Sequence, residues 1–134
     1  VELYLIGRID DSLRASSLKN VHFLGFKDPS KLSAYYNAAD LLVLTMDNDS
    51  TLKIEEYKKA RKPIIAIDGR LRNVFINREN AYLTADFRVG INELKNNKKL
   101  MLKLKRNSAK FKVFSWRQVS DIYFGILKEI YNEK

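Results

Sequence analysis

Cysteine is absent from the 134 residues of this sequence, and histidine occurs once, at His22. These absences exclude disulfides, thiolate zinc sites, cysteine nucleophiles and histidine-rich metal sites. Apolar runs reach about six residues, whereas a membrane-spanning helix needs roughly 20. The first residues lack a basic segment followed by a cleavage site, so we expect no signal peptide and a cytoplasmic protein. Five glycines, two prolines and 46% hydrophobic residues are typical of one folded domain.

The net charge of +9 comes from one part of the chain. Residues 95–117, the basic segment, contain nine basic residues and no acidic one, whereas the rest of the chain has 16 of each sign. Leucine and aromatic residues are interspersed among these cations. The pattern is compatible with an amphipathic helix whose lysines are solvated, with contact to an anionic membrane, or with nucleic-acid binding. We favour the solvated helix and expect no nucleic acid, because no nucleic-acid-binding motif accompanies the charge.

Short apolar runs alternate with helical patterns over most of the chain. Strands are predicted at Val1–Ile6, Val21–Leu24, Leu41–Thr45, Pro63–Ile67 and Ala81–Thr84. Helices are predicted at Pro29–Ala39, Thr51–Arg61, Arg70–Ile76, Asn92–Lys110 and Ser115–Tyr131. Strands that alternate with helices indicate parallel pairing through βαβ crossovers. The sequence therefore predicts one α/β domain over residues 1–134, with a parallel sheet and a helical C-terminus.

The loop Met46–Ser50 joins a predicted buried strand to a helix, at the sheet edge where open parallel sheets bind ligands. Asp49, Ser50 or Thr51 can cap that helix, and its first backbone N–H groups can then bind a phosphate. The structural alternative is that these residues only cap. Glu55 and Glu56 would then be solvated helix acids that pair with Lys59.

Several segments, in order, resemble one known family. These segments are Asn20–Phe26 (NVHFLGF), Leu32–Asp40 (LSAYYNAAD), Leu41–Thr45 (LLVLT), Ser50–Ala66 (STLKIEEYKKARKPIIA) and Phe114–Trp116 (FSW). Together they resemble the C-terminal, donor-nucleotide-binding half of the GT-B glycosyltransferases of group 1, also called family 4. The resemblance implies a Rossmann-like parallel sheet flanked by helices. It also implies a retaining transfer from a nucleotide diphosphate sugar, a UDP- or GDP-sugar, without a metal or other cofactor.

The resemblance implies two candidate catalytic residues, Asn48 and Glu56. Glu56 stands at the second glutamate of the family's Glu-x7-Glu signature, which accepts hydrogen bonds from the nucleotide ribose. Asn48 stands where the family has the first glutamate, which contacts the donor sugar, so this chain departs from the pattern there.

Further donor contacts follow from the same resemblance. Backbone N–H groups of Ser50, Thr51 and Leu52 would hold the diphosphate, and Lys53 would supply positive charge. Gly25 and Phe26 align with the loop that brackets the nucleobase, although Phe26 is equally consistent with a core position.

The resemblance also implies that part of the enzyme lies outside this sequence. A complete GT-B enzyme has an N-terminal domain that binds the acceptor, here a saccharide or a lipid-linked sugar. Val1–Gly7 resembles the second strand of the C-terminal half, so the family's first and central strand has no counterpart. We therefore expect a fragment of a two-domain enzyme of polysaccharide biosynthesis that is inactive alone. Peripheral contact with the inner face of a membrane stays open as an alternative to the solvated helix. The alternatives are a non-catalytic nucleotide-binding or interaction module of the same fold, and a nucleic-acid-binding domain that uses residues 95–117.

Overall fold

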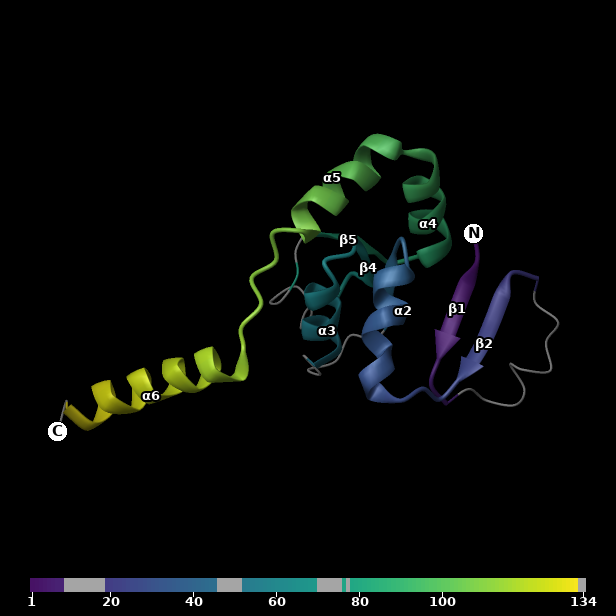
Figure 1. Ribbon diagram of the computed structural model, residues 1–134. Helices are drawn as coiled ribbons and strands as arrows, with labels where there is room; N and C mark the ends of the chain where they lie inside the picture. Colours follow the sequence, from purple (N-terminus) through teal and green to yellow (C-terminus); the bar gives the residue numbers. More distant parts are fainter. Residues whose placement is uncertain (9–18, 46–51, 70–75, 77, 133–134) are drawn as a thin grey trace. The chain divides into compact units, whose positions relative to one another are not determined.

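The computed structural model describes residues 1–8, 19–45, 52–69, 76 and 78–132 (Figure 1). The chain divides into two compact units, Val1–Ala39 and Asp40–Lys134. All five predicted strands are present, each within about one or two residues of its predicted ends. Among the described residues, no helix has both the length and the apolarity to cross a membrane.

The first unit contains two parallel strands and a short helical segment. β1 and β2 pair with Leu3 opposite Val21 and Leu5 opposite Phe23. Its elements are β1 (Leu3–Ile6), β2 (Val21–Gly25), the 3₁₀ turn η1 (Pro29–Lys31) and α2 (Leu32–Ala38). His22 Nε2 lies 2.7 Å from Glu2 Oε2, within hydrogen-bond distance, and the His22 ring stacks on Tyr4 with 4.6 Å between centroids. His22 therefore has structural partners in the first unit.

The helical segment of the first unit begins with a capped turn. Pro29 suits the first position of this segment, because the backbone N–H that proline lacks would have no partner within the helix there. The Asp28 carboxylate accepts hydrogen bonds from the backbone N–H of Ser30 at 2.8 Å and from its hydroxyl at 2.7 Å. These two hydrogen bonds lower the pKa of the Asp28 carboxyl, because both donors favour its charged form. The Ser30 hydroxyl has the larger effect and the Ser30 backbone N–H the smaller.

The second unit contains a three-stranded parallel sheet with the order β3-β4-β5. Its strands are β3 (Leu42–Leu44), β4 (Ile64–Ile67) and β5 (Ala81–Thr84). Ile64, Ile65 and Ala66 on the central strand are 0% exposed. A continuous apolar run is expected for a strand that is covered on both faces, so the residues of β4 account for its central position.

Two helices pack beside this sheet, α4 (Phe87–Asn96) and α5 (Lys98–Ser108). Ile65 of the sheet, Leu94 of α4 and Leu104 of α5 form one buried cluster. Gly90 permits the close approach of α4, since a Cβ atom there would lie 2.9 Å from both Ile65 Cδ1 and Tyr82 Cε1. One part of the core of the second unit is therefore the contact between Ile65 of β4 and the buried sides of α4 and α5.

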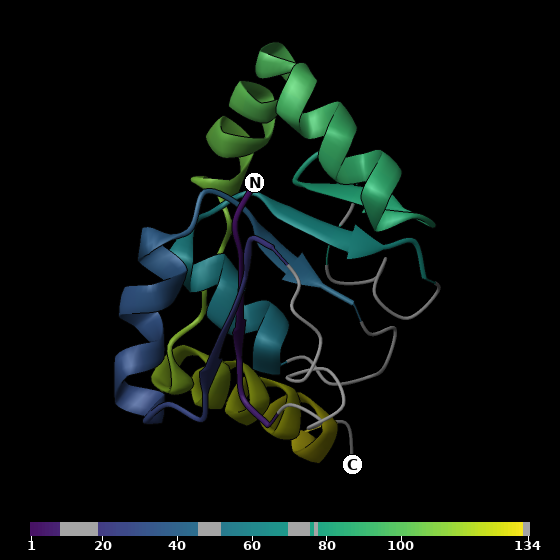
Figure 2. The same ribbon diagram turned by 90° about the vertical axis from the view of Figure 1, so that its right-hand side faces the viewer.

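The predicted single helix Asn92–Lys110 is wrong, because two helices meet there at a bend (Figure 2). The first begins earlier, at Phe87, where the Asp86 carboxylate accepts hydrogen bonds from the N–H groups of Arg88 and Val89. The second begins after Asn97, whose side-chain oxygen accepts from the Leu100 N–H at 2.9 Å. Asparagine is more favourable at a helix N-cap than in a helix interior. Asn97 therefore ends α4 and caps the start of α5.

The last helix, α6 (Trp116–Asn132), confirms the predicted start at Ser115. The Gln118 N–H donates to Ser115 Oγ at 3.2 Å, and the Ser115 N–H donates to Gln118 Oε1 at 2.8 Å. This reciprocal arrangement is a capping box, in which each side chain satisfies a backbone donor of the other residue.

Candidate functional site

The candidate donor site is built on α3 (Leu52–Ala60), which follows β3 in the chain. Ile54 is 2% exposed and anchors the inner side of the helix. The Tyr57 hydroxyl donates to the backbone carbonyl of Val43 at 3.2 Å and joins the helix to β3. These two contacts fix which side of α3 faces outward. At 100° per residue, Glu56 lies on the side of the helix opposite Ile54, together with Leu52.

Glu56 is half-exposed, and its carboxylate forms an ion pair with Lys53. Nζ of Lys53 lies 2.7 Å from Oε2 of Glu56, and the two side chains are 43% and 42% exposed. Glu55 forms a matching pair with Lys58, also at 2.7 Å, but there the lysine is only 13% exposed. The predicted pairing of both glutamates with Lys59 is therefore wrong. Each glutamate has a lysine three residues away, and these partners are used instead.

The two ion pairs differ in the order of their charges along α3. Glu55 precedes Lys58, which places the acid nearer the positive N-terminal end of the helix dipole. Lys53 precedes Glu56, so a cation lies in the first turn, where the dipole disfavours it. An added anion near Lys53 would therefore improve the electrostatics of this end of the helix. A carboxylate such as Glu56 is in turn a strong acceptor for hydroxyl donors.

Leu52 is the first residue of α3, and its side chain is 67% exposed. Asn48, Ser50 and Thr51, the predicted contacts to donor sugar and diphosphate, lie outside the described residues. The predicted short helix at Arg70–Ile76 also lies outside them, apart from Ile76, which is 1% exposed.

Gly25 and Phe26 belong to the first unit, at the carboxyl end of β2. Gly25 has φ +67°, a backbone conformation that favours glycine, and its carbonyl accepts a hydrogen bond from the Gly7 N–H at 3.0 Å. Phe26 is 76% exposed, so its alternative interpretation as a core residue is wrong. An exposed aromatic ring at the end of a parallel strand is available for stacking.

Two polar groups at the carboxyl edge of the second sheet were not among the predicted site residues. Asp68 directly follows β4, and its carboxylate forms an ion pair with Arg78. Asp86 follows β5 and caps α4. Position alone would have drawn attention to Asp68, since an acid immediately after a buried parallel strand lies at the ligand-binding edge.

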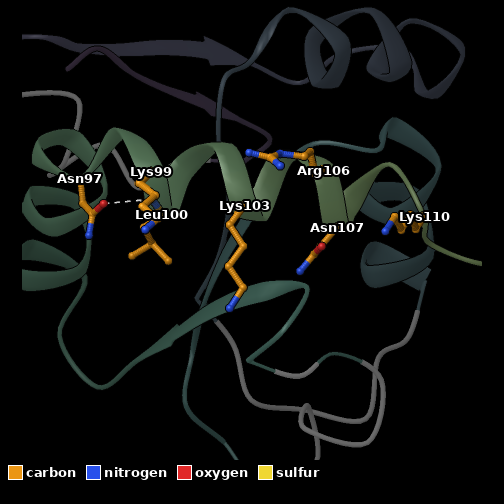
Figure 3. Close-up of a pocket in the computed structure, with 7 residues that line it drawn as sticks. All are labelled: Asn97, Lys99, Leu100, Lys103, Arg106, Asn107 and Lys110. Atoms are coloured by element: carbon orange, nitrogen blue, oxygen red, sulfur yellow. Dashed lines mark hydrogen bonds between the residues drawn. The ribbon is translucent and has the colours of Figure 1, made fainter.

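A shallow cavity of about 500 Å³ lies along α5, away from the predicted donor residues in the sequence (Figure 3). Its lining includes Leu100 and two asparagines, and the other lining residues are Lys99, Lys103, Arg106 and Lys110. Figure 3 shows Lys103 and Asn107 extending to the same side of the helix. Among the described residues, no group of three or more histidine, aspartate or glutamate side chains is arranged to hold a metal ion.

The fold is that of a Rossmann-like α/β protein, with parallel strands and flanking helices. Residues 1–97 match the family described as glycosyl transferases group 1, and the chain belongs to that family. The resemblance predicted from the sequence segments is thus confirmed.

One similar solved structure is the Anabaena protein Alr3699/HepE in complex with UDP-glucose. The TM-score is 0.64 at 18% sequence identity, and the match covers 81% of this chain and 35% of that protein. This chain therefore corresponds to about a third of the length of HepE. A sequence comparison with curated proteins gives no significant match.

Proposed function

We propose that this chain is the donor-nucleotide-binding half of a retaining glycosyltransferase that uses a nucleotide diphosphate sugar. The observation that carries the proposal is the outward-facing carboxylate of Glu56, on a helix anchored to a buried parallel strand. Membership of the group 1 glycosyltransferases and the similarity of fold to a protein crystallised with UDP-glucose support it. No metal or other cofactor takes part in the proposed reaction.

Each proposed contact uses a group suited to one part of the donor. Glu56 accepts hydrogen bonds from the ribose hydroxyls, as an ionised carboxylate can. Backbone N–H groups of Ser50, Thr51 and Leu52 bind the diphosphate at the positive end of α3. Asn48 binds hydroxyls of the transferred sugar, and Gly25 and Phe26 contact the base.

Lys53 has a double role in this proposal. Without a ligand it neutralises Glu56 through the 2.7 Å ion pair. With a donor bound, its ammonium group also contacts the diphosphate and offsets part of the ligand charge. Because the pair is about two-fifths exposed, separating its partners costs little. The ion pair is thus compatible with binding.

The remaining parts of the reaction are proposed for the whole enzyme. An N-terminal domain binds the acceptor, a saccharide or a lipid-linked sugar, and the transferred group is a hexosyl unit. We place the enzyme in the cytoplasm, in polysaccharide biosynthesis. In this proposal the present chain binds the donor but is inactive without the acceptor domain, and residues 1–134 act as one donor-binding domain.

A second candidate function is a non-catalytic nucleotide-binding module of the same fold. The observation that favours it is Asn48, which carries no negative charge where the family's pattern has a glutamate. An amide can bind sugar hydroxyls, but it stabilises a developing oxocarbenium ion less than a carboxylate does. Binding of the nucleotide through Glu56 is common to both functions, whereas transfer is not.

The experiment is a calorimetric titration of the full chain with UDP, GDP and ADP, repeated on Glu56→Ala. Loss of a charge-assisted hydrogen bond is expected to cost about 1.5–3 kcal/mol, which weakens nucleotide binding roughly 10- to 100-fold. Glu55→Ala is the matched control, because it removes the neighbouring glutamate and its lysine pair from the same helix.

Three results are informative. Selective weakening in Glu56→Ala supports the donor site, and the preferred nucleotide identifies the base. Equal weakening in both variants would show that helix stability, and not a ribose contact, controls binding. Absence of saturable binding in a folded wild-type chain would contradict the proposal for this chain.

A further inference from the structure

Helix α5 has one buried side and one strongly charged side. Leu104 and Ser108 are 2% and 0% exposed, and the Asn107 side chain donates to the Glu79 carbonyl at 2.5 Å. The exposed residues of the helix and of the turn after it include six cations. We call these the cationic face: Lys98, Lys99, Lys103, Lys105, Arg106 and Lys110.

The charges of the cationic face are not neutralised within the described structure. The ion pairs between described residues join Lys53, Lys58 and Arg78 to acids, His22 contacts Glu2, and none of these interactions involves α5. The sequence itself has no acid between Lys95 and Arg117. Four of the six cations line the same cavity, so their positive potentials add there (Figure 3).

Leu102 lies in the middle of the cationic face. It is 53% exposed, although Leu100 and Leu104 show that the helix has an inner side for leucine. Residues three and four positions away are neighbours on a helix surface. For Leu102 all four such neighbours are basic, namely Lys98, Lys99, Lys105 and Arg106. An apolar side chain is thus held outward inside a ring of positive charge.

We propose that the cationic face of α5 binds the surface of an anionic lipid bilayer, with Leu102 inserted between the headgroups. The partner is identified by charge complementarity, since clusters of four to eight lysines and arginines on a helix bind acidic headgroups. The basic side chains contact lipid phosphates, and the leucine enters the apolar boundary beneath them. This inference is independent of the proposed donor site, because no residue is shared between them.

The exposed side chain of Leu102 favours a membrane over a nucleic acid as the partner of the cationic face. Both partners offer rows of phosphates, but a nucleic acid binds exposed side chains through base stacking or base-edge hydrogen bonds. None of the residues of α5, Lys98 to Ser108, is aromatic. A bilayer in contrast provides an apolar layer directly below its phosphates, which suits a leucine surrounded by cations.

The test measures co-sedimentation of the full chain with vesicles. One set contains phosphatidylcholine alone, and the other an equal mixture of phosphatidylcholine and phosphatidylglycerol. Each basic residue near an anionic leaflet contributes about a fivefold gain in partitioning. A quadruple variant that removes four of these charges is therefore expected to partition at least about 100-fold more weakly onto the mixed vesicles. Its substitutions are Lys99→Gln, Lys103→Gln, Arg106→Gln and Lys110→Gln.

A matched control removes the same charge from other exposed positions. The variant Lys19→Gln, Lys31→Gln, Lys59→Gln, Arg88→Gln has the same net charge as the first variant, and all four wild-type residues are exposed. Its loss of partitioning onto the mixed vesicles is expected to be less than about a tenth of the loss in the first variant, because those four residues do not share one helix face. Circular dichroism establishes that each variant is folded.

The single variant Leu102→Gln tests insertion itself. It keeps every charge, and loss of an inserted leucine is expected to weaken partitioning about fivefold or more. Equal losses in the two charge variants, no effect of Leu102→Gln, or binding to phosphatidylcholine alone would overturn the proposal. Displacement of the chain from mixed vesicles by duplex DNA, with Leu102→Gln binding that DNA normally, would assign the face to nucleic acid instead. Failure of nucleotide binding would leave these results unchanged, since the vesicles contain none.

Discussion

Strands β1 and β4 have four residues each and a parallel neighbour, yet they differ in burial. In β1 the first two residues are exposed and the last two are half-buried, whereas three of the four residues of β4 are fully buried. β4 lies between two strands and beside α4, while β1 is one of two strands in its sheet. The difference teaches that an apolar run becomes core only where other elements cover both of its faces.

The same difference in burial separates two of the proposed donor contacts, Glu56 and Phe26. Glu56 is carried by a helix whose neighbour Ile54 is buried, and that helix bonds to β3. Phe26 belongs to the first unit, in which every described residue is either exposed or half-buried. We therefore expect Glu56 to be the more firmly positioned contact of the two.

The largest predicted effect tests this contrast directly. Ile65→Ala removes a 0% exposed side chain from the core of the second unit and is expected to cost about 2–5 kcal/mol in unfolding free energy. Leu5→Ala, in the half-buried part of β1, is expected to cost less than half as much, because the site is already partly solvated. Urea unfolding followed by circular dichroism measures both. Equal losses would show that the two units are buried to the same extent in solution.

A smaller effect is expected at the closest contact in the core of the second unit. Gly90→Ala places a methyl group 2.9 Å from Ile65 Cδ1 and Tyr82 Cε1, so atoms must move. Overpacking costs about 1–3 kcal/mol, and the higher helix propensity of alanine returns about 1 kcal/mol, which leaves a small net loss of stability.

Gly125→Ala is the matched control for this substitution. Gly125 also lies within a helix, but apart from its chain neighbours and the backbone of its own helix no described atom lies within 4 Å of its added Cβ. Thermal unfolding should therefore show a lower midpoint for Gly90→Ala and an unchanged or higher one for Gly125→Ala. A higher midpoint for Gly90→Ala would mean that α4 can shift away from the sheet.

The smallest effects are expected in the pH dependence of stability. Tyr82 in the second unit contributes stability that is lost as the pH rises, whereas Asp28 in the first unit contributes stability that is lost as the pH falls. In the second unit the Tyr82 hydroxyl donates to the Glu93 carboxylate, and this hydrogen bond raises the pKa of Tyr82, with burial as the next cause. A raised pKa contributes stability that is present below the unfolded value, 10.0, and is lost as the pH rises through the folded value. Urea midpoints measured toward alkaline pH should therefore fall less steeply in Tyr82→Phe than in the wild type. Identical slopes would contradict the hydrogen bond.

Asp28 in the first unit responds at the opposite end of the pH scale. Its pKa is lowered by the Ser30 donors, so its stabilising contribution is present above 3.8 and is lost as the pH falls through the folded value. Asp28→Asn should reduce the acid sensitivity of the first unit without changing the alkaline behaviour of Tyr82.

Local sequence signals account for most of the fold. The continuous apolar runs located all five strands, and Ser115 with Gln118 formed the capping box that marks the start of α6. The bend at Asn97 was missed because apolar residues continue at helical spacing on both sides of it. The capping preference of Asn97 was the available signal.

The candidate site could be predicted only in part, for a physical reason. The position of Glu56 on the outer side of α3 follows from helix periodicity and from the anchor at Ile54. Its partner does not follow from spacing alone, since Lys53 and Lys59 are both three residues away.

The most direct test of the donor site is amide hydrogen exchange of the full chain with and without saturating UDP. Bound ligand slows exchange in the helix that holds it, because opening of that helix must compete with binding. We predict slower exchange over Leu52–Ala60, no change over Lys98–Ser108, and loss of the effect in Glu56→Ala. Protection of Lys98–Ser108 instead of Leu52–Ala60 would contradict the account, because the diphosphate would then be held by the cationic face of α5.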